Sequence, residues 1–338
     1  MKAVGFTRSL PATDAASLID FDAPEPVPVA RDLLVEVRAV SVNPVDFRVR
    51  RDQGPADFGT RILGYDAAGV VTAVGPDCEL FRPGDSVWYA GAVNRQGSNA
   101  QYQLVDERIV GRKPSALSWA DAAAMPLTLI TAWEALHEQL RVARDGSGHG
   151  KHLLLLGGAG GVGSIAIQVA KLAGLTVIAT ASRPESVSQC RRFGADHVIR
   201  HDGDIRAQLA DLCIGSVEYV FCCAQPEGYL ETVTGLMAPH AGFCTILAPR
   251  VPVDMGLFRQ KSLRYSHEYM FTRPVYQPPD MIAQHQLLTE AAALFDVGRL
   301  HSTRSATLGP INAANLRRAH AQLETTHTLG KLVLEGWS

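Results

Sequence analysis

The first third of the chain alternates short apolar runs with glycine and proline. Runs rich in Val, Ile, Leu, Phe and Tyr are typical of strands when Gly and Pro bound them. This pattern predicts strands over 2–6, 33–42, 67–74, 85–89 and 101–105. The first 125 residues or so are therefore predicted to form a compact, partly barrel-like β domain.

The pattern changes at Ser118, where apolar residues begin to recur at helical spacing. Segments 118–125 and 127–140 have this spacing, and Ser118 precedes Asp121 by three residues, as in an N-terminal capping arrangement. We therefore predict a domain boundary near residue 126. The segment 144–150, RDGSGHG, has the composition of a flexible connector.

Beyond this connector, apolar runs and helical segments alternate regularly. Strands are predicted at 152–158, 175–182, 196–199, 217–224 and 242–247, and helices at 162–173, 184–193 and 228–238. This alternation predicts a parallel, doubly wound sheet, and continuous apolar runs such as LLLL at 153–156 fit strands that are covered on both faces. Helices at 280–297 and 312–324 and a strand at 331–335 follow. We expect this tail to return to the first domain and leave a cleft between the two.

Composition excludes several classes of protein. The 338 residues are 46% hydrophobic and 20% charged, which is typical of a globular protein rather than a disordered one. A net charge of −2 argues against nucleic acid as a partner. The start of the chain has no apolar signal segment and no run approaches the length of a membrane span, so we expect a cytoplasmic location and no membrane partner. The six cysteines form no C-x-x-C pair, which favours reduced thiols packed in the core.

A glycine-rich turn follows the apolar run at 153–156. It contains G-x-G-x-x-G, with glycines at 158, 160 and 163, and it opens a helix. Gly158 is expected to allow a tight turn, Gly160 to let backbone amides approach a pyrophosphate, and Gly163 to let the helix pack on the strand. Because strand, turn, helix and second strand follow in order, the motif predicts dinucleotide binding rather than a turn without a ligand.

The end of the second strand indicates which dinucleotide binds. An NAD site usually has Asp or Glu about 20 residues beyond the turn, but this sequence has Ser182 and Arg183 there. A guanidinium and a hydroxyl can both bind a 2′-phosphate, which a carboxylate would repel. We therefore predict NADPH, although a solvated loop arginine is an alternative interpretation of Arg183.

Several segments together resemble the medium-chain dehydrogenase/reductase superfamily. The resemblance is to its zinc-free quinone oxidoreductase branch and the zinc-type alcohol dehydrogenase-like subfamily. It rests on SVNPVD at 41–46, LGYDAAGVVTAVG at 63–75, MPLTLITAWEAL at 125–136, GGAGGVG at 157–163, and further segments that reach GKLVLEG at 330–336. It implies an α/β protein with a GroES-like, β-rich catalytic domain over 1–126 and 266–338 and a Rossmann NADPH-binding domain over 127–265, usually in a homodimer.

The sequence departs from the zinc-dependent members of this superfamily. Those members ligate a catalytic zinc with Cys and with His-Glu of a G-H-E-x-x-G segment, where this chain has Asn43, Tyr65 and Asp66. The region 89–112 also contains no cysteine for a structural zinc lobe. We therefore expect no metal.

The resemblance also implies which residues bind the cofactor. Thr128 resembles a residue that contacts nicotinamide, while Gly160, Gly161 and Val162 are expected to face the pyrophosphate. Ser182 and Arg183 are expected to face the 2′-phosphate. His201 is a further candidate beside that phosphate or simply a surface histidine, and Lys331 either reaches the cofactor phosphates or is a solvated charge. The adjacent Cys222 and Cys223 are interpreted first as packing residues.

Without a Lewis acid, reduction of a quinone or an activated alkene needs less assistance than interconversion of an alcohol and a ketone. Such a reaction requires donors that stabilise a developing oxyanion, and Asn43 and Tyr65 are the candidates; Tyr65 is alternatively an aromatic wall of the pocket. Asp46 is expected to hold its loop, and Phe47 stands where relatives often have a hydroxyl side chain. Two alternatives are an alcohol or ketone reductase and a non-catalytic NADPH-binding sensor or structural protein.

Overall fold

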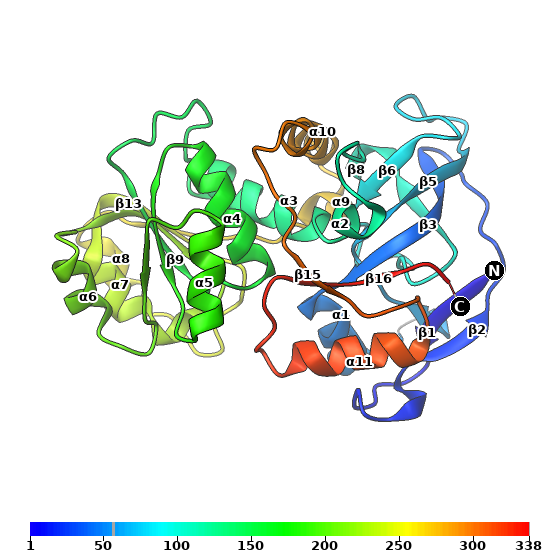
Figure 1. Cartoon of the computed structure of the whole chain (residues 1–338), viewed down its shortest axis with the longest axis horizontal. Helices are drawn as coiled ribbons and strands as arrows, with labels where there is room; N and C mark the ends of the chain where they lie inside the picture. The colour runs from blue at the N-terminus through cyan, green and yellow to red at the C-terminus, as the bar shows by residue number, and fades with distance from the viewer. Residues whose placement is uncertain (56–57, 338) are drawn as a thin grey trace. The chain divides into compact units, whose positions relative to one another are not determined.

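The computed structural model describes residues 1–55 and 58–337. The chain divides into two compact units (Figure 1). The β-rich unit contains Met1–Ile130 and Phe271–Ser338, and the parallel-sheet unit contains Thr131–Met270. No helix of the described residues is long and apolar enough to cross a membrane.

The β-rich unit is built around a largely antiparallel sheet. Its strand order is β15 (Arg304–Thr307), β16 (Lys331–Glu335), β3 (Asp32–Val42), β5 (Ala67–Val74), β6 (Ser86–Tyr89) and β8 (Val110–Arg112), and β7 (Tyr102–Asp106) also pairs with β3. A smaller sheet has the order β2 (Ile19–Asp22), β1 (Lys2–Phe6) and β4 (Arg61–Ile62). The predicted strands of the first domain are confirmed, with ends that shift by one residue at most.

The helices of the β-rich unit come from both parts of the chain. They are α1 (Pro44–Arg48), α2 (Trp119–Ala123), α3 (Pro126–Glu134), which continues into the next unit, α9 (Thr272–Tyr276), α10 (Ala283–Asp296) and α11 (Ala313–Glu324). The Ser118 hydroxyl accepts a hydrogen bond from Asp121 N at 3.0 Å, so the predicted cap of α2 is confirmed. The tail returns to the first domain as expected, because β16 pairs with β3 in antiparallel register.

The parallel-sheet unit is a doubly wound sheet in the order β11 (His197–Ile199), β10 (Thr176–Thr180), β9 (His152–Leu156), β12 (Val217–Cys222), β13 (Met237–Thr245) and β14 (Arg264–His267). All of its strand pairs are parallel. Helices α4 (Gly161–Leu172) and α5 (Pro184–Arg192) cover one face, and α6 (Ile205–Asp211) and α7 (Leu230–Leu236) cover the other (Figure 1). A short helix, α8 (Gly256–Arg259), packs against α7.

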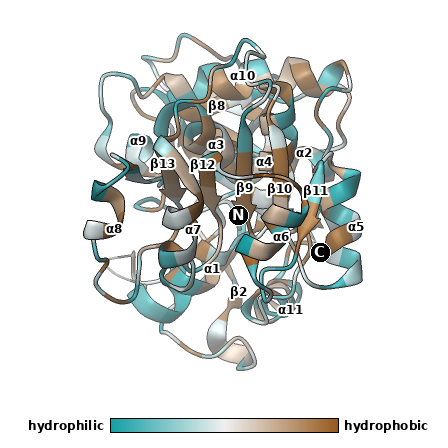
Figure 2. Cartoon of the chain, turned by 90° about the vertical axis from the view of Figure 1, so that its left-hand side faces the viewer, coloured by the Kyte–Doolittle hydropathy of each residue, from teal (hydrophilic) through white to brown (hydrophobic). Residues whose placement is uncertain are grey.

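The core of this sheet explains its apolar strands. Leu154, Leu156, Val220 and Phe243 are completely buried, and Figure 2 shows β9, β12 and β13 in the brown of hydrophobic residues. Burying both faces of a central strand requires apolar side chains at successive positions, which the run at 153–156 supplies.

The predicted domain limits need a small correction. The units change at residues 130 and 270 rather than at 126 and 265. The second limit moves because β14 pairs with β13 and so belongs to the parallel sheet. Its sequence, RYSH, has too little apolar character to be predicted as a strand. The helix predicted at 228–238 is shorter, since β13 already begins at Met237.

Candidate active site

The glycine-rich turn lies between β9 and α4. Gly157 has a φ of +87°, and its N–H donates to Thr180 Oγ1 at 3.0 Å, while Gly158 N–H donates to Thr180 O at 3.1 Å. Helix α4 begins after Gly160, which caps it without a side chain. The turn therefore presents a helix N-terminus whose first amides have no capping side chain, an arrangement suited to binding an anion.

Each glycine of the turn is needed for a different reason. A Cβ on Gly163 would lie 2.3 Å from Gly157 O, and one on Gly158 would lie 2.8 Å from Ala179 Cβ. A Cβ on Gly160, in contrast, would meet only Gly157 O, at 3.9 Å. The residue that makes the tight turn is Gly157, not Gly158 as predicted, because it has the positive φ; Gly158 is required for packing. Gly160 faces open space, as expected if the backbone there approaches a ligand.

The carboxyl ends of β10 and β11 carry a group of basic residues. Ser182 and Arg183 follow β10 and are partly exposed, and Arg183 Nε lies 3.5 Å from Glu185 Oε1. Arg200 Nη1 donates to Ser182 O at 3.3 Å and its Nη2 to Asp202 Oδ2 at 2.7 Å. His201 is exposed. The sequence reasoning missed Arg200, although its position directly after β11, the strand that pairs with β10, could have revealed it.

A buried polar cluster occupies the β-rich unit; it consists of Asn43, Asp46, Asp66 and Lys331. Each of these residues is at most 3% exposed. Asp66 Oδ1 accepts a hydrogen bond from Leu127 N at 2.7 Å, and Asp66 Oδ2 accepts one from Asn43 Nδ2 at 2.7 Å. Lys331 Nζ lies 3.1 Å from Asp66 Oδ2. Burial raises the pKa of the Asp66 carboxyl, and the Lys331 ammonium and the Asn43 amide offset part of this increase.

Asp46 joins two loops within the same cluster. Its Oδ2 accepts from Asn43 N at 2.7 Å and its Oδ1 from Gly64 N at 3.0 Å. Burial raises the pKa of Asp46 to about 7, opposed by the hydrogen bond from Asn43 N–H and by the charge of Lys331. This geometry agrees with the expected loop-holding role of Asp46.

The structure places Lys331 differently from its predicted role at the cofactor phosphates. Its Nζ donates to Val42 O at 2.8 Å and to Asn43 Oδ1 at 2.5 Å, in addition to its contact with Asp66. An ammonium has three N–H groups, so these acceptors use all of them. The expectation of a phosphate contact or a solvated charge is therefore corrected, because the side chain is buried and its donors are occupied.

The other predicted residues of the β-rich unit lie on segments that the cluster holds. Tyr65 is fully buried, and its ring packs edge-on against Phe271 with centroids 5.4 Å apart. Thr128 is 3% exposed, and its Oγ1 donates to Met125 O at 3.1 Å. Tyr65 lies between the two cluster-bound residues Gly64 and Asp66, and Thr128 directly follows Leu127. The hydrogen bonds of Asp46 and Asp66 thus bind Asn43 and the immediate neighbours of Tyr65 and Thr128 within one unit.

Metal ligation and thiol chemistry receive no support from the described residues. Within residues 1–55 and 58–337, no group of three or more His, Cys, Asp or Glu side chains could hold a metal ion. Cys222 is the last residue of β12 and Cys223 follows it; burial raises the pKa of both thiols, to about 12 for Cys222. Neutral thiols, buried at Cys222 and partly buried at Cys223, fit the packing role expected of this pair.

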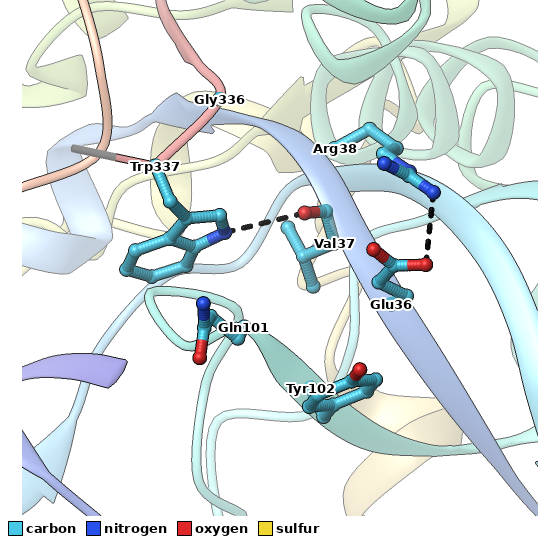
Figure 3. A pocket seen from close by; sticks show the side chains of 7 residues that line it. All are labelled: Glu36, Val37, Arg38, Gln101, Tyr102, Gly336 and Trp337. Carbon is cyan, nitrogen blue, oxygen red and sulfur yellow. Dashed lines mark hydrogen bonds and ion pairs between the residues drawn. The ribbon is translucent and has the colours of Figure 1, made fainter. Parts of the chain in front are cut away.

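A surface hollow of about 290 Å³ lies elsewhere on the β-rich unit (Figure 3). Trp337 Nε1 donates to Val37 O at 3.3 Å in its wall, and Arg38 pairs with Glu36 at 2.9 Å. None of the predicted site residues lines it.

The turn of the parallel-sheet unit fits a dinucleotide. The open side of Gly160 and the first amides of α4 suit a pyrophosphate, and the polar side chains after β10 and β11 lie where a Rossmann sheet holds a ribose. When bound, a nicotinamide dinucleotide supplies a hydride. Gly160, Gly161 and Val162 would lie beside the pyrophosphate, and Ser182, Arg183 and Arg200 beside the ribose.

Matches to two known families identify the chain as an oxidoreductase. Residues 29–126 match the alcohol dehydrogenase GroES-like domain family, and residues 161–284 match the zinc-binding dehydrogenase family. The chain belongs to the medium-chain dehydrogenase/reductase superfamily, and this fold implies a nicotinamide cofactor.

Individual relatives extend over the whole chain. A zinc-type alcohol dehydrogenase-like protein of Staphylococcus aureus strain Mu50 is 41% identical over 335 residues, which cover 99% of each chain. A solved structure from Rhizobium etli, described as a zinc-dependent alcohol dehydrogenase, is 50% identical with a TM-score of 0.95 and covers 100% of this chain and 98% of that one. The quinone oxidoreductase of Coxiella burnetii is 25% identical with a TM-score of 0.79 and covers 99% of both chains.

Proposed function

We propose that the protein is a zinc-independent, NADPH-dependent oxidoreductase that transfers hydride to a quinone or to an activated alkene, an α,β-unsaturated carbonyl compound. The observation that supports this acceptor class is the occupation of Asp66. Its two oxygens accept from Leu127 N and Asn43 Nδ2 and face Lys331 Nζ, which leaves no lone carboxylate for a zinc ion. Amide and phenol side chains at positions 43 and 65 are poor zinc ligands. The names of the Staphylococcus aureus and Rhizobium etli relatives mention zinc. The proposal of zinc independence therefore rests on the side chains at positions 43, 65 and 66 of this chain and not on those names.

The preference for NADPH is supported by the charges at the ends of β10 and β11. Arg183 and Arg200 supply guanidinium groups around Ser182, and Ser182 and Arg183 take the position where NAD sites usually have an acid. Arg200 adds a second guanidinium to the pair Ser182 and Arg183, on which the sequence-based prediction of NADPH rests. Glu185 and Asp202 pair with these guanidinium groups and are about half exposed, so both carboxylates have room to move aside for a phosphate.

The protein's part in the reaction is to orient the acceptor and to stabilise negative charge on its oxygen. Tyr65 is the proposed donor, because a phenol donates a hydrogen bond at neutral pH. Asn43 is the second candidate, although one of its amide hydrogens already binds Asp66 and its carbonyl oxygen already accepts from Lys331. Thr128 would border the nicotinamide. A homodimer in the cytoplasm is part of the same proposal.

Steady-state kinetics tests the proposal. The protein, dialysed against EDTA, is assayed with NADPH and NADH against quinones, enones, ketones and alcohols. We expect turnover of quinones or enones with NADPH. Faster turnover of ketones would favour the alternative of an alcohol or ketone reductase, and NADPH binding without turnover on the whole panel would favour the sensor.

A further inference from the structure

Three segments of the β-rich unit carry the residues proposed to meet the substrate and nicotinamide. They are 42–46, 64–66 and 126–128, and each is bound by the buried polar cluster. Asp46 accepts from the backbone of Asn43 and Gly64, and Asp66 accepts from the backbone of Leu127. The cluster therefore links all three segments, in addition to the pairing of β3 with β5 next to two of them.

Lys331 supplies the cation on which the cluster depends. Asp46 and Asp66 are both fully buried, and the Lys331 side chain is 4% exposed. Two neighbouring carboxylates without a cation would repel each other and disfavour their ionised forms. The three donors of Lys331 also have directions, since they end on Val42 O, Asn43 Oδ1 and Asp66 Oδ2. Charge and geometry together hold Asn43 and Asp66 in one arrangement.

We propose that Lys331 is a positioning residue, whose ammonium acts through Asn43 and Asp66 to fix the backbone that carries Tyr65 and Thr128. This inference rests on the proposed function, because it assigns Lys331 to the placement of the acceptor and the nicotinamide. It also separates Lys331 from the cofactor phosphates. The link to Thr128 runs from Nζ to Asp66 Oδ2 at 3.1 Å and from Asp66 Oδ1 to Leu127 N at 2.7 Å.

The two roles for Lys331 predict opposite kinetic effects. A phosphate ligand binds the cofactor equally in the ground and transition states, so its loss raises the KM for NADPH and leaves kcat unchanged. A positioning residue changes the geometry of the reacting groups, so its loss lowers kcat and leaves cofactor affinity unchanged. Measuring kcat and the KM for NADPH separately therefore distinguishes the two roles. A measurement of protein stability alone would not distinguish them.

The main variant is Lys331→Met, which keeps the length of the side chain and removes its charge. We expect kcat on the best quinone or enone to fall by about 10-fold to 100-fold, with the Kd for NADPH, measured by calorimetry, within about twofold of the parent value. Lys151→Met, at an exposed lysine of the parallel-sheet unit, is the control and should change neither value. A weaker Kd with kcat retained would overturn the proposal, and so would no change in either.

A second set of variants covers poor folding of Lys331→Met. The double variant Lys331→Met with Asp66→Asn removes a buried charge of each sign and should show the same loss of kcat with NADPH affinity retained. In Lys331→Ala, added methylammonium should enter the space of the side chain and restore part of kcat. Absence of rescue in a folded Lys331→Ala protein that binds NADPH normally would count against an ammonium role.

One measurement does not require turnover. Hydrogen exchange of the Leu127 and Gly64 amides, both donors to the cluster, should be faster by about 10-fold or more in Lys331→Met than in the parent. Unchanged exchange at both amides would refute the positioning role even if the parent reduced no acceptor on the panel. If only the proposed function were wrong, the parent would reduce no acceptor on the panel, but the Leu127 and Gly64 amides would still exchange faster in Lys331→Met than in the parent.

Discussion

His320 is expected to make the β-rich unit sensitive to acid. It lies on α11, is completely buried, and neither of its ring nitrogens has a hydrogen-bond partner among the described residues. Arg50 lies nearby, 1% exposed, and pairs with Glu324 on the same helix. Burial lowers the pKa of His320 to about 3, and the positive charge of Arg50 contributes to the shift. Protonation of this ring would place a second buried cation beside Arg50.

The size of the effect follows from proton linkage. A histidine with a pKa of 6.5 when unfolded and about 3 when folded stabilises the fold above pH 6.5 and loses this contribution as the pH falls. At about 1.36 kcal/mol per unit of pKa, the full loss below pH 3 is about 5 kcal/mol. Between about pH 7 and 4.5, the loss in the free energy of unfolding is about 2.5 kcal/mol.

The variant His320→Leu removes the titrating group and no hydrogen bond. We expect its free energy of unfolding at neutral pH to match or exceed that of the parent, since it buries no unsatisfied nitrogen. Its stability should then fall by about 2.5 kcal/mol less than the parent's between about pH 7 and 4.5. Urea unfolding is carried out at both pH values, and hydrogen exchange of peptides from α11 is the readout. This readout reports the unfolding of the β-rich unit alone. His149→Leu, at an exposed histidine, is the control. An unchanged acid dependence in His320→Leu would refute this reasoning.

Four further predictions concern the cofactor, the acceptor, a metal and a buried acid. Arg183→Asp should weaken NADPH binding about tenfold or more, the contribution of one charge-assisted contact, and equal affinity of the parent for NADH and NADPH would contradict the assignment. Tyr65→Phe should lower kcat and kcat/KM together by about 10-fold to 100-fold with NADPH affinity unchanged, and a fully active variant would reduce Tyr65 to a pocket wall. Activity should survive EDTA dialysis, and elemental analysis showing about one zinc per chain afterwards would disprove metal independence. Burial and the neighbouring Glu134 raise the pKa of Glu268, so stability falls as pH rises above the ordinary carboxyl range; Glu268→Gln should flatten this fall, as measured by thermal unfolding at about pH 5 and pH 8.

Local patterns were sufficient for most of the fold. The apolar run at 153–156, the turn at 157–163 and Ser118 before Asp121 each depend on neighbours along the chain, and the structure has the expected elements there. Strand β14 was not predicted because it lies at the edge of the sheet and its sequence, RYSH, lacks the apolar pattern by which a strand is recognised. The position of a strand at the edge of a sheet depends on which strand it pairs with, and the periodicity of apolar residues in the sequence carries no information about that pairing.

The candidate site was less predictable for the same reason. Asn43 and Asp66 could be selected from a motif, but their partner Lys331 is 288 residues from Asn43 in sequence. Its burial depends on the register of β16 against β3, where Leu332 pairs with Val42. Arg200 was missed because only the pairing of β10 with β11 brings it to Ser182. Long-range pairs of this kind are set by sheet topology, not by spacing along the chain.

The return of the tail into the β-rich unit also has a consequence for synthesis. A nascent chain exposes the carboxylates of Asp46 and Asp66 long before Lys331 leaves the ribosome, whereas Thr131–Met270 is continuous and has its own core. Domains generally fold as units while the chain is elongating. The parallel-sheet unit is therefore able to fold first, and the β-rich unit has to wait for β16. A ribosome stalled before residue 331 would hold a folded dinucleotide-binding half beside a protease-sensitive, unfinished partner.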